Sequence, residues 1–511
     1  MKKYHISDKA AFACLSVFAF VIVLLISPDS YTHDVYFRVD SGCFFTAGKA
    51  WMSGMTPYVD FADSKGPLLW LIYGLGYLIS HDNYIGVFWI SCVVYAFTYY
   101  LTFKAAKLIV GDSQRAFLCA VLMSGAFFFP HVFYEMRAEN FGHPFMMLTL
   151  YHTLRLLLEK DLPQRKVSRS FFAYGIAFGA TMLIKYSFTV MLAPMMCYGL
   201  YWLVREKRKM LLPILSGVAG LAVVVMPFVI YFLVTGNFGA FVQEYFLNTF
   251  RTVQTGGNPL VGYLHEWGIL KLKFVLILFV LLIVGAVAMS VSMSKYRLFP
   301  IVSTLFMFAI AVRHSGFDYR YYFTAPCICL FFLICFVVSK THFKWRPWAL
   351  AATSFLFMMV CVAFSIKSEP DYHHLFWEND HRRLHFYNMA QLIGQVEHPK
   401  VIDLCNCGTG IETLPEALPA CKYWIMQHGA TPEMNAAHRA GLESGEADFI
   451  FVKFVDWVED EGIKLSELEK LGYHLCYNKF GLLYTKHDVR LPKPPHTPSN
   501  LDILLKRPWR K

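Results

Sequence analysis

Long apolar stretches recur along this chain of 511 residues, and they constrain its fold more than any other feature. A helix of roughly 20 apolar residues crosses the hydrocarbon core of a bilayer, because it satisfies its backbone hydrogen bonds internally. Hydrophobic residues make up 56% of the chain and charged residues 16%, whereas soluble domains carry about 25% charged residues. The chain is therefore predicted to be an α-helical polytopic membrane protein.

We expect about eleven membrane spans when a ruler of roughly 20 residues is applied to the sequence. The first apolar stretch follows a basic start and has no small-residue cleavage site before Pro28, so we interpret it as a retained span rather than a signal peptide. The predicted spans are 11–27, 84–110, 116–133, 141–158, 171–186, 188–204, 211–235, 273–293, 299–312, 321–339 and 348–366.

The short loops richest in lysine and arginine predict the orientation of the chain. These loops are 155–169, 205–209 and 340–346, and the positive-inside rule places all three in the cytoplasm. The predicted spans then put the N-terminus in the cytoplasm and the C-terminal portion outside. The net charge of +11 is thus explained by topology, and it does not indicate a nucleic-acid partner.

This orientation holds only if the apolar run 67–79 does not cross the membrane. The run has about 13 residues, fewer than the roughly 17 that a span needs. We interpret it as an interfacial helix on the outer surface, with Ser64 as its candidate N-cap and Pro67 in its first turn. Residues 41–53 read as a companion helix in the same outer loop.

The first outer loop carries Asp40, Asp60, Asp63 and Lys65 between these two helices. Aspartate is common in turns and at helix N-caps, so each carboxylate has a purely structural interpretation. The cluster is more informative than its members, because three acids and a lysine then face the outer membrane surface together.

Further charged groups are predicted at the same face. Arg137, Glu139 and Asn140 occupy the loop between the third and fourth spans, and Lys185 lies in an apolar run near its outer end. An ionisable residue at membrane depth usually serves a pathway or a site, although a lysine also snorkels to the interface. The segment 313–320 adds Arg313, His314, Asp318 and Arg320, which would also suit an ordinary aromatic and basic belt.

Acids that converge on cations suggest the chemistry of such a face. A carboxylate can activate a hydroxyl or hold a divalent cation, and lysine or arginine binds phosphate. A phosphate anchored in lipid beside a base suggests group transfer from a lipid-phosphate donor.

Two motifs in the first outer loop resemble those of the C-type (GT-C) membrane glycosyltransferases, the protein O-mannosyltransferase and lipid A aminoarabinose transferase superfamily. After Asp40, the sequence reads GMTPYVD at 54–60 and DSKGP at 63–67. The resemblance covers about the first 200 residues. The chain departs from the family where Ser41 replaces a second acid and where Gly66 replaces the first proline of a Lys-Pro-Pro element.

The resemblance implies an enzyme that moves a hexosyl or pentosyl group from a polyprenyl-phosphate-linked sugar to a hydroxyl of a glycan, lipid or protein. It implies inversion in a single step, a multi-pass protein of the bacterial inner membrane, and a candidate divalent cation at Asp63 or Glu139. Asp40 would be the catalytic base, and Lys65, Arg137 and Lys185 would bind the donor phosphate. Acceptor or metal candidates are Asp60, Asp63, Glu139, Asn140, His314 and Arg320.

The composition becomes polar after residue 366. We expect a GT-C-like transmembrane catalytic domain at 1–366, a linker at 367–395, a small extracytoplasmic α/β domain at 396–490 and a basic flexible tail at 491–511. In the α/β domain, 400–408 and 447–454 read as strands, 464–472 as a helix and 473–486 as a hairpin.

The cysteines of this α/β domain suggest a disulfide rather than a metal site. Cys405 and Cys407 have no second pair at zinc-site spacing, so a bond from either to Cys421 is favoured over a metal. The pairing of these cysteines and of Cys476 is left open by the sequence.

A transporter or flippase for a lipid-linked or anionic substrate is the main alternative function. It would explain many spans and buried charges, but not charges concentrated at one face, nor a large outer C-terminal portion.

Overall fold

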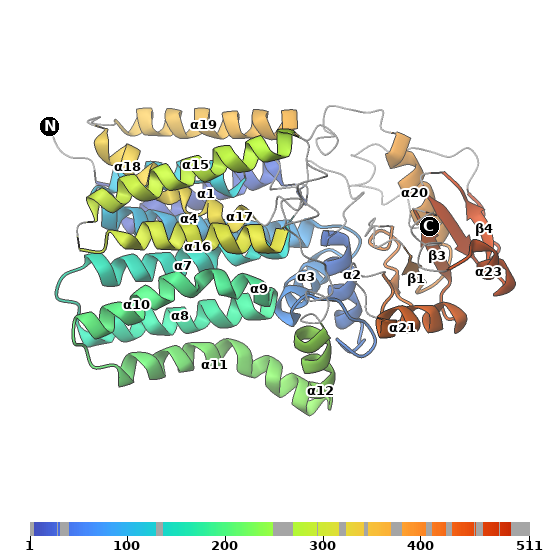
Figure 1. The fold of residues 1–511 in the computed structure, drawn as a ribbon. Helices are drawn as coiled ribbons and strands as arrows, with labels where there is room; N and C mark the ends of the chain where they lie inside the picture. The colour runs from blue at the N-terminus through green and yellow to red at the C-terminus, as the bar shows by residue number, and fades with distance from the viewer. Residues whose placement is uncertain are drawn as a thin grey trace. The chain divides into compact units, whose positions relative to one another are not determined.

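The structure is a computed structural model that describes residues 5–27, 29–30, 40–128, 136–248, 269–293, 295–315, 323–341, 346–368, 381–404, 411–425, 432–453, 455, 463–479 and 481–491 (Figure 1). The chain forms two compact units. Unit 1 comprises 1–27, 91–230 and 258–372, and unit 2 comprises 28–90, 231–257 and 373–511.

Unit 1 is entirely helical in its described part. Its helices are α1 (Asp8–Ile26), α4 (Ile85–Val110, from Ser91 on), α5 (Ser113–Leu122), α6 (Ser124–Phe127), α7 (Ala138–Leu158), α8 (Gln164–Ile184), α9 (Tyr186–Thr189), η1 (Val190–Leu192), α10 (Ala193–Arg205), α11 (Leu211–Val234, up to Ile230), α15 (Ile269–Ser292), α16 (Leu298–Ser315), α17 (Thr324–Cys327), α18 (Leu330–Lys340) and α19 (Pro347–Ser368).

Among the described residues, seven helices are long and apolar enough to cross a membrane: Asp8–Ile26, Ile85–Val110, Gln164–Ile184, Tyr186–Arg205, Leu211–Val234, Val275–Ser292 and Pro347–Phe364. This confirms a multi-pass helical protein. The predicted count of about eleven stays a prediction, because the runs 116–133, 141–158, 299–312 and 321–339 are not among the seven. The run 116–133 is divided into α5 and α6.

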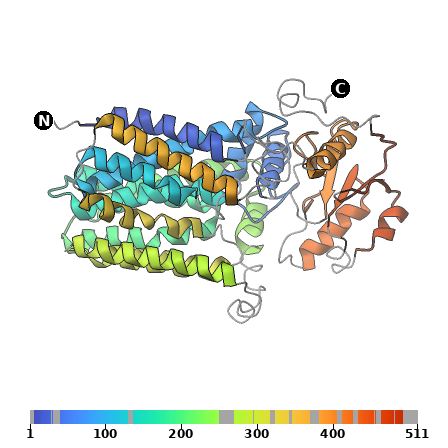
Figure 2. The same cartoon turned by 90° about the horizontal axis from the view of Figure 1, so that it is seen from above.

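The helices of unit 1 run back and forth between two ends, as both views show (Figures 1 and 2). Helices α8, α11 and α19 begin at the end where the N-terminus lies, and α7, α10 and α18 finish there. The connections 159–163 and 206–210, which belong to two of the predicted basic loops, are therefore at that end together with Lys340. Within unit 1, this arrangement agrees with the expectation that the basic loops share one side.

Unit 2 contains the helices predicted in the first outer loop. They are α2 (Asp40–Met52) and α3 (Pro67–Ile79), followed later in the chain by α12 (Phe238–Phe241) and the π-helical η2 (Val242–Asn248). The predicted cap of α3 is wrong: Gly66 occupies the N-cap position without a side-chain bond. The Ser64 hydroxyl instead donates to Asp63 and accepts from Lys65.

The C-terminal part of unit 2 holds a small mixed sheet. Strands β1 (Lys400–Asp403), β2 (Leu418–Pro419), β3 (Phe449–Val452), β4 (His474–Tyr477) and β5 (Leu482–Thr485) lie in the order β2-β1-β3-β5-β4. β1 pairs in parallel with β2 and β3, and β5 pairs antiparallel with β3 and β4. This confirms the predicted small α/β element and its terminal hairpin.

Three helices accompany the sheet: α20 (His381–Ile393), α21 (Pro432–Glu443) and α23 (Leu465–Lys470). α23 lies within the helix expected at 464–472, and α20 lies within the segment expected as a linker. Strand β3 is buried along its whole length, as are Val401 and Ile402 of β1. The expected tail lies outside the described residues apart from Leu491.

Candidate active site

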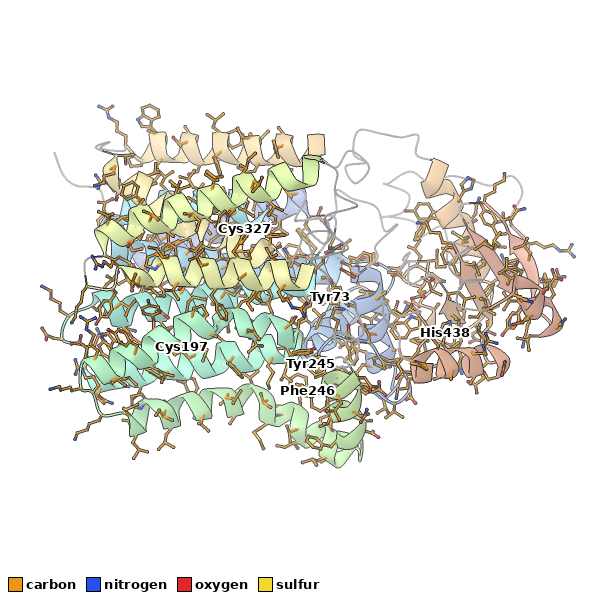
Figure 3. The ribbon with its side chains drawn as sticks, in the orientation of Figure 1. Tyr73, Cys197, Tyr245, Phe246, Cys327 and His438 are labelled. Atoms are coloured by element: carbon orange, nitrogen blue, oxygen red, sulfur yellow. The ribbon has the colours of Figure 1, made fainter. Side chains whose placement is uncertain are left out.

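Helices α2 and α3 approach each other at two glycines. A Cβ atom added to Gly48 would lie 2.4 Å from the backbone nitrogen of Gly74 and 2.8 Å from the carbonyl oxygen of Trp70. Near the start of α2, the Tyr73 ring packs edge-on against Phe44 with centroids 5.5 Å apart (Tyr73 is labelled in Figure 3). This close packing fixes α2 against α3.

That packing brings Asp40, Asp63 and Lys65 to the first turn of α2. Asp40 is the first residue of the helix and is half-buried. The Lys65 ammonium lies 5.5 Å from the centre of the Phe44 ring, one turn after Asp40, and 3.7 Å from the Asp63 carboxylate. The Lys65 and Asp63 side chains are 18% and 9% exposed, so water screens this pair only partly.

The surroundings of Cys43 show that more carboxylates gather here. Burial raises the pKa of the Cys43 thiol, and the charges of Glu412, Asp63, Asp403 and Asp40 raise it further, in that order. Cys43 is 6% exposed. The first turns of α2 therefore lie close to acids of α2 itself, of the segment between α2 and α3, and of residues 403–412, all of which belong to unit 2.

Glu412 and Lys49 join the C-terminal domain to α2, and the sequence interpretation missed both. The Thr46 hydroxyl donates to the Glu412 carboxylate over 2.8 Å, and the Lys49 ammonium donates to the Glu412 carbonyl over 2.6 Å. Burial raises the pKa of Glu412 to about 7, with Asp403 as the next cause, and burial lowers the pKa of Lys49 to about 7. A lysine inside the apolar stretch FFTAGKAWM was the visible signal for this contact.

Asp60 has a local role instead. Its carboxylate accepts from the Thr56 backbone N–H over 2.6 Å within a tight turn, and the side chain is exposed. The turn is tied to the C-terminal domain, because the Ala62 N–H donates to the Lys422 carbonyl over 2.8 Å. The interpretation of Asp60 as a turn residue is therefore better supported than a role in binding the acceptor or a metal.

The second group of predicted residues lies in unit 1. The Lys185 ammonium pairs with the Glu139 carboxylate at 2.6 Å, and the two side chains are 12% and 3% exposed. Lys185 stands in an extended conformation between the end of α8 and the start of α9. Its position in a helix break, rather than within a continuous span, aims the ammonium at the first turn of α7.

Arg137 and Asn140 shape the start of α7. Arg137 is the N-cap residue, and its backbone N–H donates to the Asn140 side-chain oxygen over 3.1 Å. The Asn140 amide in turn donates to the Tyr95 hydroxyl over 3.1 Å. The structure thus brings Arg137, Glu139, Asn140 and Lys185 together within unit 1.

Several predicted residues lie outside what the structure describes. These are the side chain of His314 and all of Asp318, Arg320, Cys405 and Cys407. The proposed disulfides to Cys405 and Cys407 therefore stay predictions. Cys421 and Cys476 form no disulfide with another described cysteine.

The candidate metal ligands already have cationic partners. Asp63 pairs with Lys65, and Glu139 pairs with Lys185. Across the described ranges, no group of three or more His, Cys, Asp or Glu side chains is arranged to hold a metal ion. Both carboxylates are therefore engaged by ammonium groups, the divalent cation stays a prediction, and the proposed transfer step does not depend on a metal.

The chain is similar to a glycosyltransferase family and to solved structures of the same type. Residues 64–231 match the family model described as dolichyl-phosphate-mannose-protein mannosyltransferase, whereas no curated protein matches the chain. ArnT from Cupriavidus metallidurans bound to undecaprenyl phosphate is 11% identical, with a TM-score of 0.56 over 93% of this chain and 97% of that chain. Its apo state gives 11% identity and a TM-score of 0.55 over 94% and 99%.

A third structure, the archaeal oligosaccharyltransferase AglB from Archaeoglobus fulgidus in complex with an inhibitory peptide and a dolichol-phosphate, is 12% identical. Its TM-score is 0.48 over 95% of this chain and 75% of that chain. The family match and the ArnT fold confirm the resemblance to GT-C type membrane glycosyltransferases of the protein O-mannosyltransferase and ArnT-like superfamily.

Proposed function

We propose that this chain, which has the GT-C fold, transfers a monosaccharide from a polyprenyl-phosphate donor to an acceptor hydroxyl at the outer membrane face. The observation that carries the proposal is the grouping of Asp40, Asp63 and Lys65 at the first turn of α2. It supplies a base and a cation in one partly buried place. The family match, which begins at residue 64, and the fold shared with an undecaprenyl-phosphate-binding protein support the same donor class.

Asp40 is assigned the role of general base. Its carboxylate takes the proton of the acceptor hydroxyl as the oxygen attacks the anomeric carbon, and the bond from that carbon to the phosphate oxygen breaks in the same step. Attack from the side opposite the phosphate inverts the anomeric centre. The sugar gains oxocarbenium character while negative charge grows on the departing phosphate.

We propose, on the sequence motifs, that Lys65 of unit 2 is one candidate for binding the donor phosphate and that Arg137 and Lys185 of unit 1 are the others. A cation held in a partly buried site stabilises developing negative charge better than one in water, because the effective dielectric constant is lower. Lys65 and Lys185 each have a carboxylate partner, and we propose that these partners orient the ammonium groups. We also propose that Asp63 and Glu139 contribute to acceptor binding, and that the chain resides in the bacterial inner membrane.

Asp40→Asn tests this assignment, with Asp60→Asn as its matched control. Both substitutions remove one carboxylate from the same loop, but Asp60 is exposed in a turn. We expect Asp40→Asn to lower transfer by about 100-fold or more and Asp60→Asn to change it little. Transfer is measured on purified protein by the consumption of lipid-linked sugar. Near-normal transfer by a folded Asp40→Asn variant would remove Asp40 from the mechanism.

The same assay separates a transferase from a transporter or flippase. A transferase forms product in detergent solution, where no membrane separates two compartments. A transporter or flippase would form no product under these conditions. Nothing in the described residues or the comparisons favours transport. Lipid extracts of cells that overproduce the chain would identify the donor that is consumed and the acceptor that gains the sugar.

A further inference from the structure

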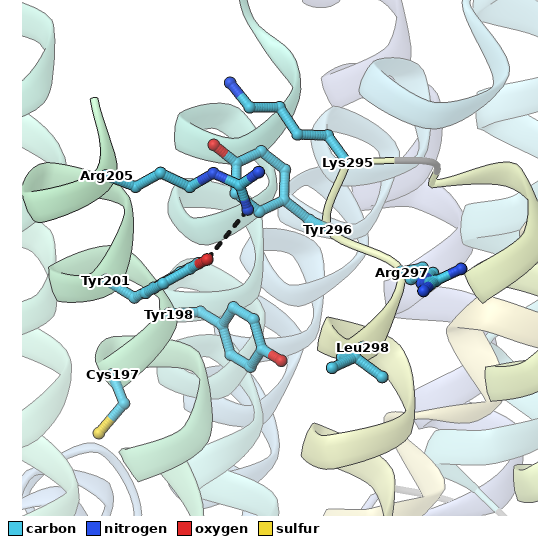
Figure 4. A pocket seen from close by; sticks show the side chains of 8 residues that line it. All are labelled: Cys197, Tyr198, Tyr201, Arg205, Lys295, Tyr296, Arg297 and Leu298. Carbon is cyan, nitrogen blue, oxygen red and sulfur yellow. Dashed lines mark hydrogen bonds between the residues drawn. The ribbon is translucent and has the colours of Figure 1, made fainter.

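A basic and aromatic cavity of about 360 Å³ lies within unit 1, apart from the residues assigned to transfer (Figure 4). It is formed where α10 ends and α16 begins, at the end of the unit that carries the basic loops (Figure 1). Its lining comprises Cys197, Tyr198, Tyr201 and Arg205 of α10, the turn residues Lys295, Tyr296 and Arg297, and Leu298 of α16.

Arg205 is held by two tyrosine rings. The central carbon of its guanidinium lies 5.3 Å from the centre of the Tyr296 ring and 5.8 Å from that of Tyr201. One guanidinium nitrogen donates to the Tyr201 hydroxyl over 2.9 Å, as the dashed line in Figure 4 marks. A guanidinium has five N–H donors, and in the described part of the chain no carboxylate lies within ion-pair distance of Arg205. The group is oriented, and most of its donors remain available to a ligand.

Three cations, Arg205, Lys295 and Arg297, line the cavity, and one carboxylate, that of Glu206, lies at its edge. The Glu206 carboxylate accepts from the Lys295 ammonium over 2.5 Å and from the Tyr296 hydroxyl over 2.9 Å. These two bonds lower the pKa of Glu206 below its ordinary value, so the carboxylate neutralises Lys295 at neutral pH. Arg205 and Arg297 have no such partner among the described residues, and the cavity therefore favours an anion.

Apolar side chains continue from the cavity along both helices. On α16, Leu298, Val302 and Leu305 are 58%, 40% and 44% exposed, and their spacing of four and three residues places them on one face. On α10, Tyr201 and Val204 are 48% and 61% exposed. Exposed apolar stripes on membrane helices contact hydrocarbon, so a ligand of the cavity would lie beside lipid chains.

A simple topological role does not account for this arrangement. The positive-inside rule requires only lysine and arginine in a short loop. It does not require a guanidinium held between two rings, or a cavity that adjoins two apolar stripes. These features match an amphiphile that has an anionic head and hydrocarbon chains.

We propose that this cavity binds the phosphate of an anionic glycerophospholipid, whose acyl chains lie along the exposed stripes of α10 and α16. Arg205 donates to the phosphate oxygens, because a guanidinium matches phosphate geometry with two parallel N–H bonds. Arg297 adds positive charge around the head group, whereas the charge of Lys295 is balanced by Glu206. This site is separate from sugar transfer, and the proposal stands or falls independently of it.

Lipid binding to the purified full chain in neutral detergent tests the proposal. Native mass spectrometry counts bound phosphatidylglycerol and phosphatidylcholine as each lipid is titrated. We expect the parent to prefer phosphatidylglycerol, and Arg205→Ala to weaken its binding about tenfold, as the loss of a charge-assisted contact would. Lys209→Ala removes an equal charge from the same basic loop but does not line the cavity, and it should retain parent affinity.

Three outcomes would overturn the proposal. Equal weakening by Lys209→Ala would show that bulk charge, not the cavity, attracts the lipid. Unchanged phosphatidylglycerol affinity in Arg205→Ala would exclude the guanidinium as the ligand. Displacement of the lipid by millimolar inorganic phosphate would show that a free phosphate is the occupant. If Arg205→Ala does not fold, Tyr201→Phe decides: it removes the hydroxyl that orients Arg205, and an unchanged affinity contradicts the proposal while a several-fold loss supports it.

Discussion

Lys185 has both a structural and a functional interpretation, and they can be separated. Its ammonium is paired with a Glu139 carboxylate that is 3% exposed, so removing the lysine leaves a buried charge without compensation. Such a loss destabilises a protein by roughly 3–5 kcal/mol. A loss of transfer in Lys185→Ala would therefore say little by itself about the donor phosphate.

The double variant Lys185→Met with Glu139→Gln resolves this ambiguity. It replaces the ion pair with neutral side chains of similar volume, so we expect thermal stability to return most of the way to that of the parent. We expect transfer to stay low, because the proposed phosphate contact of Lys185 is still missing and the proposed acceptor contact of Glu139 is removed with it. Thermal unfolding and single-turnover transfer are measured on the same preparations. Recovery of transfer in the double variant would reduce Lys185 to a structural role.

Glu412 should make stability depend on pH in a defined direction. Burial raises its pKa in the folded chain to about 7, above the ordinary value of roughly 4.3 for glutamate. Its contribution to stability is therefore fully present below the unfolded pKa and is lost as pH rises through the folded pKa. Glu412→Gln removes this dependence, so the variant should gain stability relative to the parent between about pH 4.5 and 7.

The measurement is the difference in Tm between Glu412→Gln and the parent across this range. Glu397→Gln is the control, because Glu397 belongs to the same part of the chain and its side chain is 94% exposed. The difference in Tm between Glu397→Gln and the parent should not change with pH. A Glu412→Gln difference that does not grow as pH rises would contradict the assignment of a buried, protonated carboxylate.

At the scale of elements, the contact between α2 and α3 determines where Asp40 and Lys65 lie. Gly48→Ala places a methyl group within 2.4–2.8 Å of the α3 backbone, so the helices must separate. We expect lower thermal stability, by about 1–3 kcal/mol as overpacked positions show, together with reduced transfer. Gly239→Ala in α12 is the control, since its Cβ would meet no atom within 4 Å. Equal effects of the two variants would contradict the packing argument.

The helices were predictable where local chemistry defines them. The short apolar run after Gly66 gave the bounds of α3, and proline at its first position agrees with the observed start. The run 116–133 was predicted as one span, yet the structure divides it near Ser124. The Ser124 hydroxyl donates to the Val121 carbonyl over 2.6 Å, and such local bonds compete with helical ones.

The site was predictable only within each segment. The grouping of Asp63 with Lys65 follows from adjacency, and the loop that holds Glu139 was recognised from its charges. The contacts of Glu412 with Thr46 and Lys49 join positions more than 360 residues apart. Spacing along a sequence contains no information about such pairs, because they depend on how the C-terminal domain packs against α2 within unit 2.

At the scale of the whole molecule, we predict that the termini lie on opposite sides of the membrane. In unit 1, the connections after α7 and α10 share the end where the N-terminus lies (Figure 1), and the positive-inside rule assigns this end to the cytoplasm. Compartment-specific reporters fused within 160–169 and after residue 501 should therefore report opposite sides, the first cytoplasmic and the second external. A third fusion within 206–209 is the control and should agree with the first. If the fusions within 160–169 and after 501 report the same side, the number of spans between them is even, so at least one of the seven runs predicted between 171 and 366 does not cross. An external signal from the fusion within 160–169 would instead contradict the predicted orientation of the basic loops, as a crossing of 67–79 would produce.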